Sequence, residues 1–251
     1  MQNIWPGFQL KIKLGIQNKM GKTIGILGGM GPHATIDLFN KIVCNTPSKV
    51  DQDHHSIIIY NNPKIPPRMY AFDKGAESPL QELIRSAIVL ESAGADFIIM
   101  SCNTAHIWLD ELKRNINIPF YSMIENTVEH LLKLKASRIE KMLLFATEST
   151  IQAHLYQNAL VNSSYRIVVP KVDEQQLVNR AIKDVKTGKI STNNYINDLN
   201  LIIQKYKSNG ISIAVGGCTE IPLLFPYIDT DIMMIDPTLL LAKMAINKAM
   251  I

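Results

Sequence analysis

Residues 93–104 read AGADFIIMSCNT, and residues 209–220 read NGISIAVGGCTE. In both stretches a turn glycine precedes an apolar strand, which a small residue, a cysteine and a polar residue follow. Hydrophobic patterning alone would align any two strand-helix units, so the patterning is the weaker part of the match. The cysteines, Cys102 and Cys218, coincide as well. We interpret the match as an internal duplication, with halves too long for a solenoid array.

Apolar strand candidates alternate with longer helical patterns along the chain, as is typical of parallel α/β proteins. The expected strands are Thr23–Leu27, Ser56–Tyr60, Asp96–Met100, Lys141–Phe145, Arg166–Val169 and Ser212–Val215. The expected helices are Ala34–Val43, Ser78–Gly94, Ile124–Lys135, Ile151–Val161, Glu174–Lys186 and Asn194–Asn209. Together with the duplication, this order predicts two pseudo-symmetric small α/β domains with parallel sheets and an active-site cleft between them.

The same pattern gives expected domain limits. We expect residues 22–122 to form an N-terminal α/β domain, with residues 232–251 packing back on it. Residues 123–231 then form the C-terminal α/β domain. Residues 1–21 fit no periodic element, and we expect them to be a leader without ordered structure.

Composition narrows the classes of function. The chain has 251 residues, of which 47% are hydrophobic, enough for an ordinary buried core. Its net charge of +4 includes Lys11, Lys13 and Lys19 in a stretch without acids, so nucleic acid is not implied. No apolar run approaches the roughly 20 residues that span a bilayer, and no signal peptide is recognisable. The three cysteines form no Cys-x-x-Cys pair. We therefore expect a cytoplasmic protein with reduced thiols and no membrane partner.

Cys102 and Cys218 each follow a predicted strand and precede a helical segment, where ligands bind in parallel sheets. A helix N-terminus lowers the pKa of a thiol and favours the thiolate. Two thiols on opposite sides of one cleft can remove an α-proton from one face of a carbon and return a proton to the other. This predicts a racemase or epimerase. No cofactor loop or metal-ligand cluster accompanies the thiols, so we expect neither cofactor nor metal.

Three segments resemble a known family: TIGILGGMGP at 23–32, SCNTAH at 101–106 and GGCTEIP at 216–222. Together they resemble the aspartate/glutamate racemase family, specifically its aspartate racemase branch. The resemblance implies cofactor-independent interconversion of L- and D-aspartate, or of glutamate, by a thiol and a thiolate, and commonly a homodimer. It makes Cys102 and Cys218 the acid/base pair.

The resemblance also implies residues that bind a small dicarboxylic amino acid. Asn103 and Thr104, with Thr219 near the other thiol, are expected to hold the α-carboxylate. Arg68 and Lys171 match the positions that hold the side-chain carboxylate in aspartate-specific relatives. A guanidinium and an ammonium suit a dicarboxylate chemically. Two threonines of a loop in the second half also match the family pattern: Thr147 and Thr150.

Acidic residues at the starts of helical segments have structural as well as functional interpretations. Glu220 either hydrogen-bonds the substrate ammonium or only complements a helix N-terminus. Glu125 and Asp236 follow short strands at corresponding positions of the two halves, and we interpret both as helix caps.

Other functions stay open. Within the same class, a hydantoin racemase or a broad-specificity amino-acid racemase is the alternative. His106, four residues after Cys102, suggests a Cys-His hydrolase, which would leave Cys218 without a task. From a different class, Gly29-x-Gly31-x-x-Ala34 suggests a non-catalytic dinucleotide- or metabolite-binding protein.

The dinucleotide fingerprint calls for an acid about 20 residues on, at the end of the second strand. That strand ends in Asn61 and Asn62 instead. We interpret the glycines of residues 28–31 as allowing the backbone to pass close to a small bound carboxylate, with Met30 lining the pocket.

Overall fold

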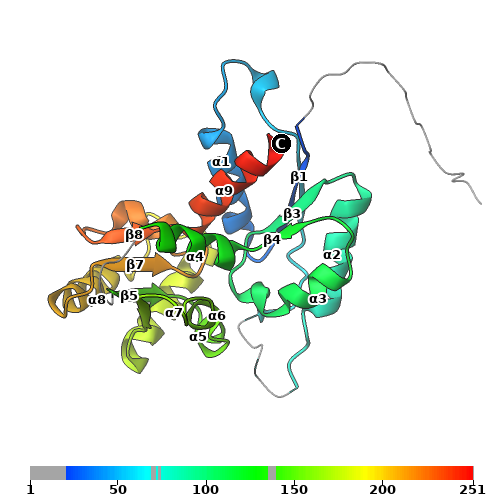
Figure 1. The fold of residues 1–251 in the computed structure, drawn as a ribbon. Helices are drawn as coiled ribbons and strands as arrows, with labels where there is room; N and C mark the ends of the chain where they lie inside the picture. The colour runs from blue at the N-terminus through cyan, green and yellow to red at the C-terminus, as the bar shows by residue number, and fades with distance from the viewer. Residues whose placement is uncertain (1–20, 69–71, 73–74, 135–139, 251) are drawn as a thin grey trace, which may run out of the picture.

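The computed structural model describes residues 21–68, 72, 75–134 and 140–250. The expected leader therefore lies outside the described residues, apart from Gly21. The described chain contains two four-stranded parallel sheets, and Figure 1 shows them as separate units covered by helices. None of the described helices is long and apolar enough to cross a membrane.

The first sheet has the strand order β2-β1-β3-β4. Its strands are β1 (Ile24–Gly28), β2 (Ile57–Asn61), β3 (Phe97–Met100) and β4 (Phe120–Tyr121). The helical segments between them are α1 (Pro32–Asn45), η1 (Asp51–Asp53), α2 (Leu80–Ser92), η3 (Thr104–Trp108) and α3 (Leu109–Arg114).

The second sheet has the strand order β6-β5-β7-β8, and α4 (Met123–Lys133) leads into it. Its strands are β5 (Glu140–Phe145), β6 (Tyr165–Val168), β7 (Ile213–Gly216) and β8 (Met233–Ile235). Its helical segments are α5 (Glu148–Gln152), α6 (Leu155–Ala159), α7 (Val172–Lys186), α8 (Ile196–Ser208) and η4 (Pro222–Tyr227).

The two sheets repeat one topology. In the first, Ile24 of β1 pairs with Phe97 of β3, and in the second, Met142 of β5 pairs with Ile213 of β7. β3 and β7 are buried along their whole length because helices cover both faces of each sheet. The predicted pair of pseudo-symmetric parallel α/β units is confirmed.

The last helix, α9 (Pro237–Ala249), returns from the second sheet to the first. It packs against α1, and Figure 1 shows the two helices side by side. Leu241 and Ile246 of α9 share a core cluster with Ile24 and Leu38. At its end the carbonyl of Ala249 accepts a hydrogen bond from the backbone N–H of residue 22 at 2.8 Å. The exact domain limits stay predictions.

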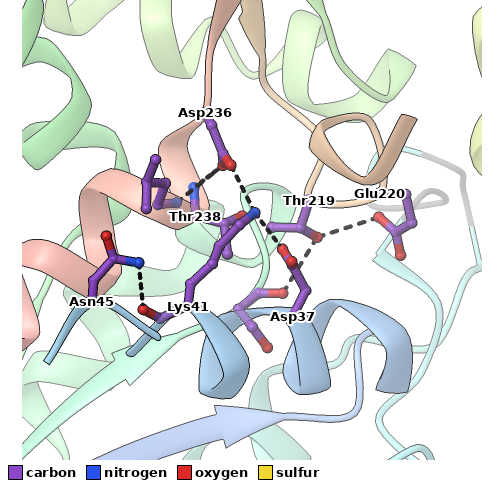
Figure 2. A network of polar contacts seen from close by, with 9 residues as sticks. Asp37, Lys41, Asn45, Thr219, Glu220, Asp236 and Thr238 are labelled. Atoms are coloured by element: carbon purple, nitrogen blue, oxygen red, sulfur yellow. Dashed lines mark hydrogen bonds and ion pairs between the residues drawn. The ribbon is translucent and has the colours of Figure 1, made fainter. Parts of the chain in front are cut away.

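A cluster of three charges ties α1 to the start of α9. Lys41 Nζ lies 2.6 Å from Asp37 Oδ2 and 2.7 Å from Asp236 Oδ2. Figure 2 shows Lys41 between the two carboxylates. Asp236 also caps α9, since its Oδ1 accepts hydrogen bonds from the backbone N–H groups of Thr238 and Leu239. The expected cap at Asp236 is confirmed.

Two local expectations are wrong. Ser122, not Glu125, caps α4, because its hydroxyl accepts the hydrogen bond of the Glu125 backbone N–H. The expected helix 151–161 is split into α5 and α6, because His154 adopts a left-handed conformation with φ of 51°. Such a residue cannot continue a right-handed helix.

Candidate active site

A pocket of about 270 Å³ lies at the carboxyl ends of the strands of both sheets. This volume suits a molecule of amino-acid size rather than a dinucleotide. The first half contributes Gly29, Met30, Pro32, Pro63, Ile65, Pro67, Arg68, Cys102, Asn103 and Thr104. The second half contributes Thr147, Lys186, Cys218, Thr219 and Glu220. The pocket is thus the expected cleft between the units.

Cys102 and Cys218 both line this pocket, each just beyond its strand. Each is 6% exposed, and both are free thiols. The segments that follow, η3 and η4, are short 3₁₀ helices. The structure therefore brings the two thiols to one cavity, each followed by the helical segment that the sequence predicts.

The two thiols have different neighbours. Cys218 Sγ donates a hydrogen bond to Glu220 Oε2 at 3.0 Å, and Glu220 is only 1% exposed. The same oxygen accepts a weaker contact from the Thr219 hydroxyl at 3.3 Å, drawn in Figure 2. Burial, and then the Glu220 charge, raise the pKa of the Cys218 thiol, against the lowering effect of Lys186. The expected lowering of a thiol pKa is wrong for Cys218.

His106 supports the backbone behind Cys102 rather than its sulfur. Its Nδ1 lies 2.8 Å from the Cys102 carbonyl oxygen, and its Nε2 accepts the Met123 backbone N–H at 3.0 Å. Since Nε2 is the acceptor, Nδ1 carries the hydrogen and the ring is neutral. Burial lowers the pKa of His106 to about 4. The ring does not form the nucleophile pair that a Cys-His hydrolase requires.

Asn103 presents a free donor at the pocket. Its Oδ1 accepts a hydrogen bond from the Tyr156 hydroxyl of α6 at 2.6 Å, which fixes the amide. Its Nδ2 is buried without a partner among the described residues. A buried amide donor of this kind stabilises an anion that reaches it.

A triangle of hydroxyls joins the two halves beside Cys102. Thr104 Oγ1 lies 2.9 Å from Thr147 Oγ1 and 2.8 Å from Thr150 Oγ1, and the latter two are 3.0 Å apart. Thr104 and Thr147 line the pocket, whereas Thr150 is fully buried behind them. Thr147 also caps α5 by accepting the Thr150 backbone N–H.

Arg68 is held by backbone carbonyls. Its guanidinium donates to the carbonyl oxygens of Ile65 at 3.2 Å, Pro66 at 3.0 Å and Met30 at 3.0 Å. Among the described residues, its buried Nε has no hydrogen-bond partner and no carboxylate forms an ion pair with the guanidinium. The group is therefore a positioned cation at the pocket wall.

Lys171 does not reach the pocket. It is exposed at the start of α7, where its backbone N–H donates to Glu174 Oε2 at 2.8 Å. The lysine that lines the pocket is Lys186, at the other end of the same helix. Burial lowers the pKa of Lys186, but the nearby Glu220, Cys218 and Cys102 outweigh this effect and raise it overall. The placement expected for Lys171 is wrong, and sequence reasoning missed Lys186.

The glycine loop is shaped by the second strand. Gly29 has φ of 93°, and a Cβ there would lie 2.3 Å from the backbone carbon of Asn62. Gly29 is thus required by the close approach of residue 62. Met30, 2% exposed, lines the pocket next to it. Within the described residues, no group of three or more His, Cys, Asp or Glu side chains could hold a metal ion.

Comparison with known proteins agrees with this architecture. The family model described as Asp/Glu/Hydantoin racemase matches residues 27–245. The chain belongs to this family and is an isomerase of the racemase class. It is 28% identical over 232 residues to the broad-specificity amino-acid racemase RacX of Bacillus subtilis, covering 89% of this chain and 96% of the relative.

Solved structures show the same fold. An aspartate racemase of Picrophilus torridus superposes with a TM-score of 0.80 at 32% identity, over 91% of this chain and 94% of the other. An aspartate racemase homologue of Pyrococcus horikoshii superposes with a TM-score of 0.72 at 28% identity, over 91% and 99%.

Proposed function

We propose that the protein racemises aspartate with Cys102 and Cys218 as the acid/base pair. The observation that carries the proposal is the meeting of both thiols at one pocket of amino-acid size. One sulfur, as thiolate, takes the α-proton, so the C–H bond breaks and an S–H bond forms. The other thiol gives its proton to the opposite face of the carbanion and becomes the thiolate. Protons balance, and the sulfurs exchange roles when the substrate is the other enantiomer.

The charges of the pocket complement aspartate. Arg68 and Lys186 lie close enough to interact electrostatically, and together they form a cationic subsite for the side-chain carboxylate. Glu220 is the single acid that lines the pocket, and its Oε1 is buried without a partner among the described residues. This oxygen is the proposed acceptor for the substrate ammonium.

The α-carboxylate is proposed to bind at the amide and hydroxyl groups beside the thiols. Asn103 offers its unpaired Nδ2, and Thr104, Thr147 and Thr219 offer hydroxyls. As the α-proton leaves, negative charge spreads onto this carboxylate, so donors placed there stabilise the carbanion. Thr150 contributes by holding the hydroxyls of Thr104 and Thr147.

The test is incubation of L-aspartate with the protein in deuterated water. We expect optical rotation to decay to zero while deuterium enters the α-position, and we expect the Cys102→Ala protein to lack both signals. Absence of exchange with aspartate and glutamate would overturn the proposal.

A broad-specificity racemase is the second candidate, because the relative RacX carries that description. Alanine and lysine in the same assay distinguish the two, since neither offers a second carboxylate to Arg68 and Lys186. Comparable rates for aspartate, glutamate, alanine and lysine would favour the second candidate.

We further propose that the protein is a cytoplasmic homodimer. A reducing compartment suits a reaction that requires two free thiols. For the dimer, β2 lies at the edge of the first sheet, with Ile59 39% exposed and Phe72 nearby in sequence 52% exposed. Light scattering on the purified protein gives the oligomeric state, and a monomer at micromolar concentration would contradict the dimer.

A further inference from the structure

We propose that Glu220 holds Cys218 in its thiol form, so that Cys218 is the acid and Cys102 the base of the resting enzyme. The inference rests on the proposed two-thiol reaction and adds an asymmetry to it. Glu220 then has one task for each oxygen: Oε2 binds the Cys218 hydrogen and Oε1 faces the substrate.

The geometry places the carboxylate directly on the reacting sulfur. Cys218 Sγ lies 3.0 Å from Glu220 Oε2, shorter than an ordinary hydrogen bond to sulfur, and both residues are buried. A Cβ added to Gly31 would lie 3.4 Å from Glu220 Oε1, so this oxygen lies beside the glycine loop, of which Gly29, Met30 and Pro32 line the pocket together with Glu220. A thiolate at Cys218 would face an ionised carboxylate at the same distance, which electrostatic repulsion disfavours.

Burial has the largest effect on the pKa of the Cys218 thiol, and among the groups that face this thiol Glu220 has the largest. Lys186 of α7 is a cation and favours the thiolate, Tyr156 of α6 is neutral, and Cys102 lies across the pocket. In the described part of the chain, only Glu220 is hydrogen-bonded to the Cys218 sulfur. Burial and Glu220 both raise the pKa of the Cys218 thiol.

Cys102 has no such partner. No described carboxylate is hydrogen-bonded to its sulfur, and the residue two positions later is Thr104, whose hydroxyl joins the threonine triangle instead. Among the described residues, the two sulfurs therefore differ in whether a carboxylate is hydrogen-bonded to them.

The asymmetry has a defined consequence for turnover. When Cys102 takes the α-proton and Cys218 gives its own, the product state carries a Cys218 thiolate beside Glu220. Repulsion then favours return of a proton to Cys218 and its loss from Cys102, which restores the resting enzyme. Because racemisation has an equilibrium constant of one, kcat/KM must be equal in both directions, so the bias appears in thiol titration and in kcat and KM separately.

The direct test is titration of single thiols. The chain has three cysteines, so Cys44→Ser with Cys102→Ser leaves Cys218 alone. We expect Glu220→Gln to lower the midpoint of its thiolate absorbance by about one pH unit or more, because the substitution removes a neighbouring negative charge. The matched control keeps Cys102 alone through Cys44→Ser with Cys218→Ser, and there Glu220→Gln should shift the midpoint far less. An unchanged or raised Cys218 midpoint would overturn the inference.

A second measurement uses all three native cysteines. In the Glu220→Gln protein the alkaline limb of the kcat/KM profile for aspartate should move to lower pH, as Cys218 loses its proton earlier. A limb that stays in place contradicts the inference. If the unaltered protein racemises nothing, the proposed function fails, yet the single-thiol titration still decides the role of Glu220.

Discussion

The strand ends of the two halves have the same backbone topology but carry different side chains. β3 and β7 occupy the same place in their sheets, and each delivers a cysteine to the pocket. Two residues later the first half has Thr104, bonded across to Thr147 and Thr150, and the second half has Glu220, bonded back to its own cysteine.

This comparison teaches how a duplicated scaffold serves a substrate without symmetry. The repeated topology brings two sulfurs to one cavity, and the residue two positions after each cysteine gives the two sulfurs different neighbours. The cations also come from non-equivalent places, since Arg68 follows β2 and Lys186 ends α7.

The largest expected effect distinguishes the two pocket thiols from the third cysteine of the chain. Cys102→Ala and Cys218→Ala should each reduce racemisation by about 10³-fold or more, because each turnover requires both an acid and a base. The control is Cys44→Ala, since Cys44 is exposed on α1. Polarimetry with L- and D-aspartate measures the loss. A variant retaining a tenth of the activity would contradict the shared role.

The next largest effect concerns the three charges that tie α1 to the start of α9. Lys41→Met should destabilise the protein by about 3–5 kcal/mol, because it leaves Asp37 and Asp236 partly buried without their cation. Urea unfolding measures the loss, with the exposed Lys243→Met of α9 as the control.

The same variant has a pH signature. Burial raises the pKa of Asp37 even with Lys41 present. A carboxyl whose pKa is raised binds more protons in the folded state, so stability rises as pH falls. Since Lys41 lowers the pKa of Asp37, its removal raises that pKa further, and the variant gains more stability as pH falls. The difference in free energy of unfolding between Lys41→Met and the unaltered protein should therefore shrink from neutral toward acidic pH. A constant difference would indicate that the ion pair itself contributes little.

A smaller effect separates the two ends of α7. Lys186→Met should raise KM for aspartate by about 10- to 100-fold, as expected for a lost hydrogen bond to a charged group. Lys171→Met, at the exposed start of the helix, should leave KM unchanged. Initial-rate kinetics at fixed pH compare the pair, and equal effects would return Lys171 to the list of candidates.

The smallest effect tests the threonine triangle that joins the two halves beside Cys102. Thr150→Val should destabilise the protein by about 1–2 kcal/mol, because Thr104 and Thr147 lose a buried hydroxyl partner. Thr192→Val, at an exposed position, is the matched control. Urea unfolding of both variants decides whether the triangle stabilises the fold.

Much of the fold follows from local patterns. Strands such as β3 and β7 are uninterrupted apolar runs, and the repeated glycine and cysteine mark their ends, so the topology and both thiols could be predicted. The site residues that could not be predicted depend on where helices point. Lys171 and Lys186 lie on one helix, and only the packing of α7 across the pocket selects Lys186.

Two further features could not be predicted because they also depend on the path of the backbone. The apolar spacing of residues 151–161 continues across His154, so periodicity gives no sign of its left-handed turn. Glu220 has two local interpretations, and neither includes the sulfur two residues earlier, because a side chain's partner depends on the backbone path after β7.

The return of α9 to α1 also orders the events of synthesis. A ribosome has translated nearly the entire chain before Leu241 and Ile246 emerge to cover the first sheet. All strands of the first sheet are synthesised by Tyr121, but their cover by α9 follows only after β8 has completed the second sheet, so we expect the core of the first unit to be completed last. A gene fragment ending near residue 122 would leave the apolar face of α1 bare, whereas a circular permutant that places α9 before β1 would restore it.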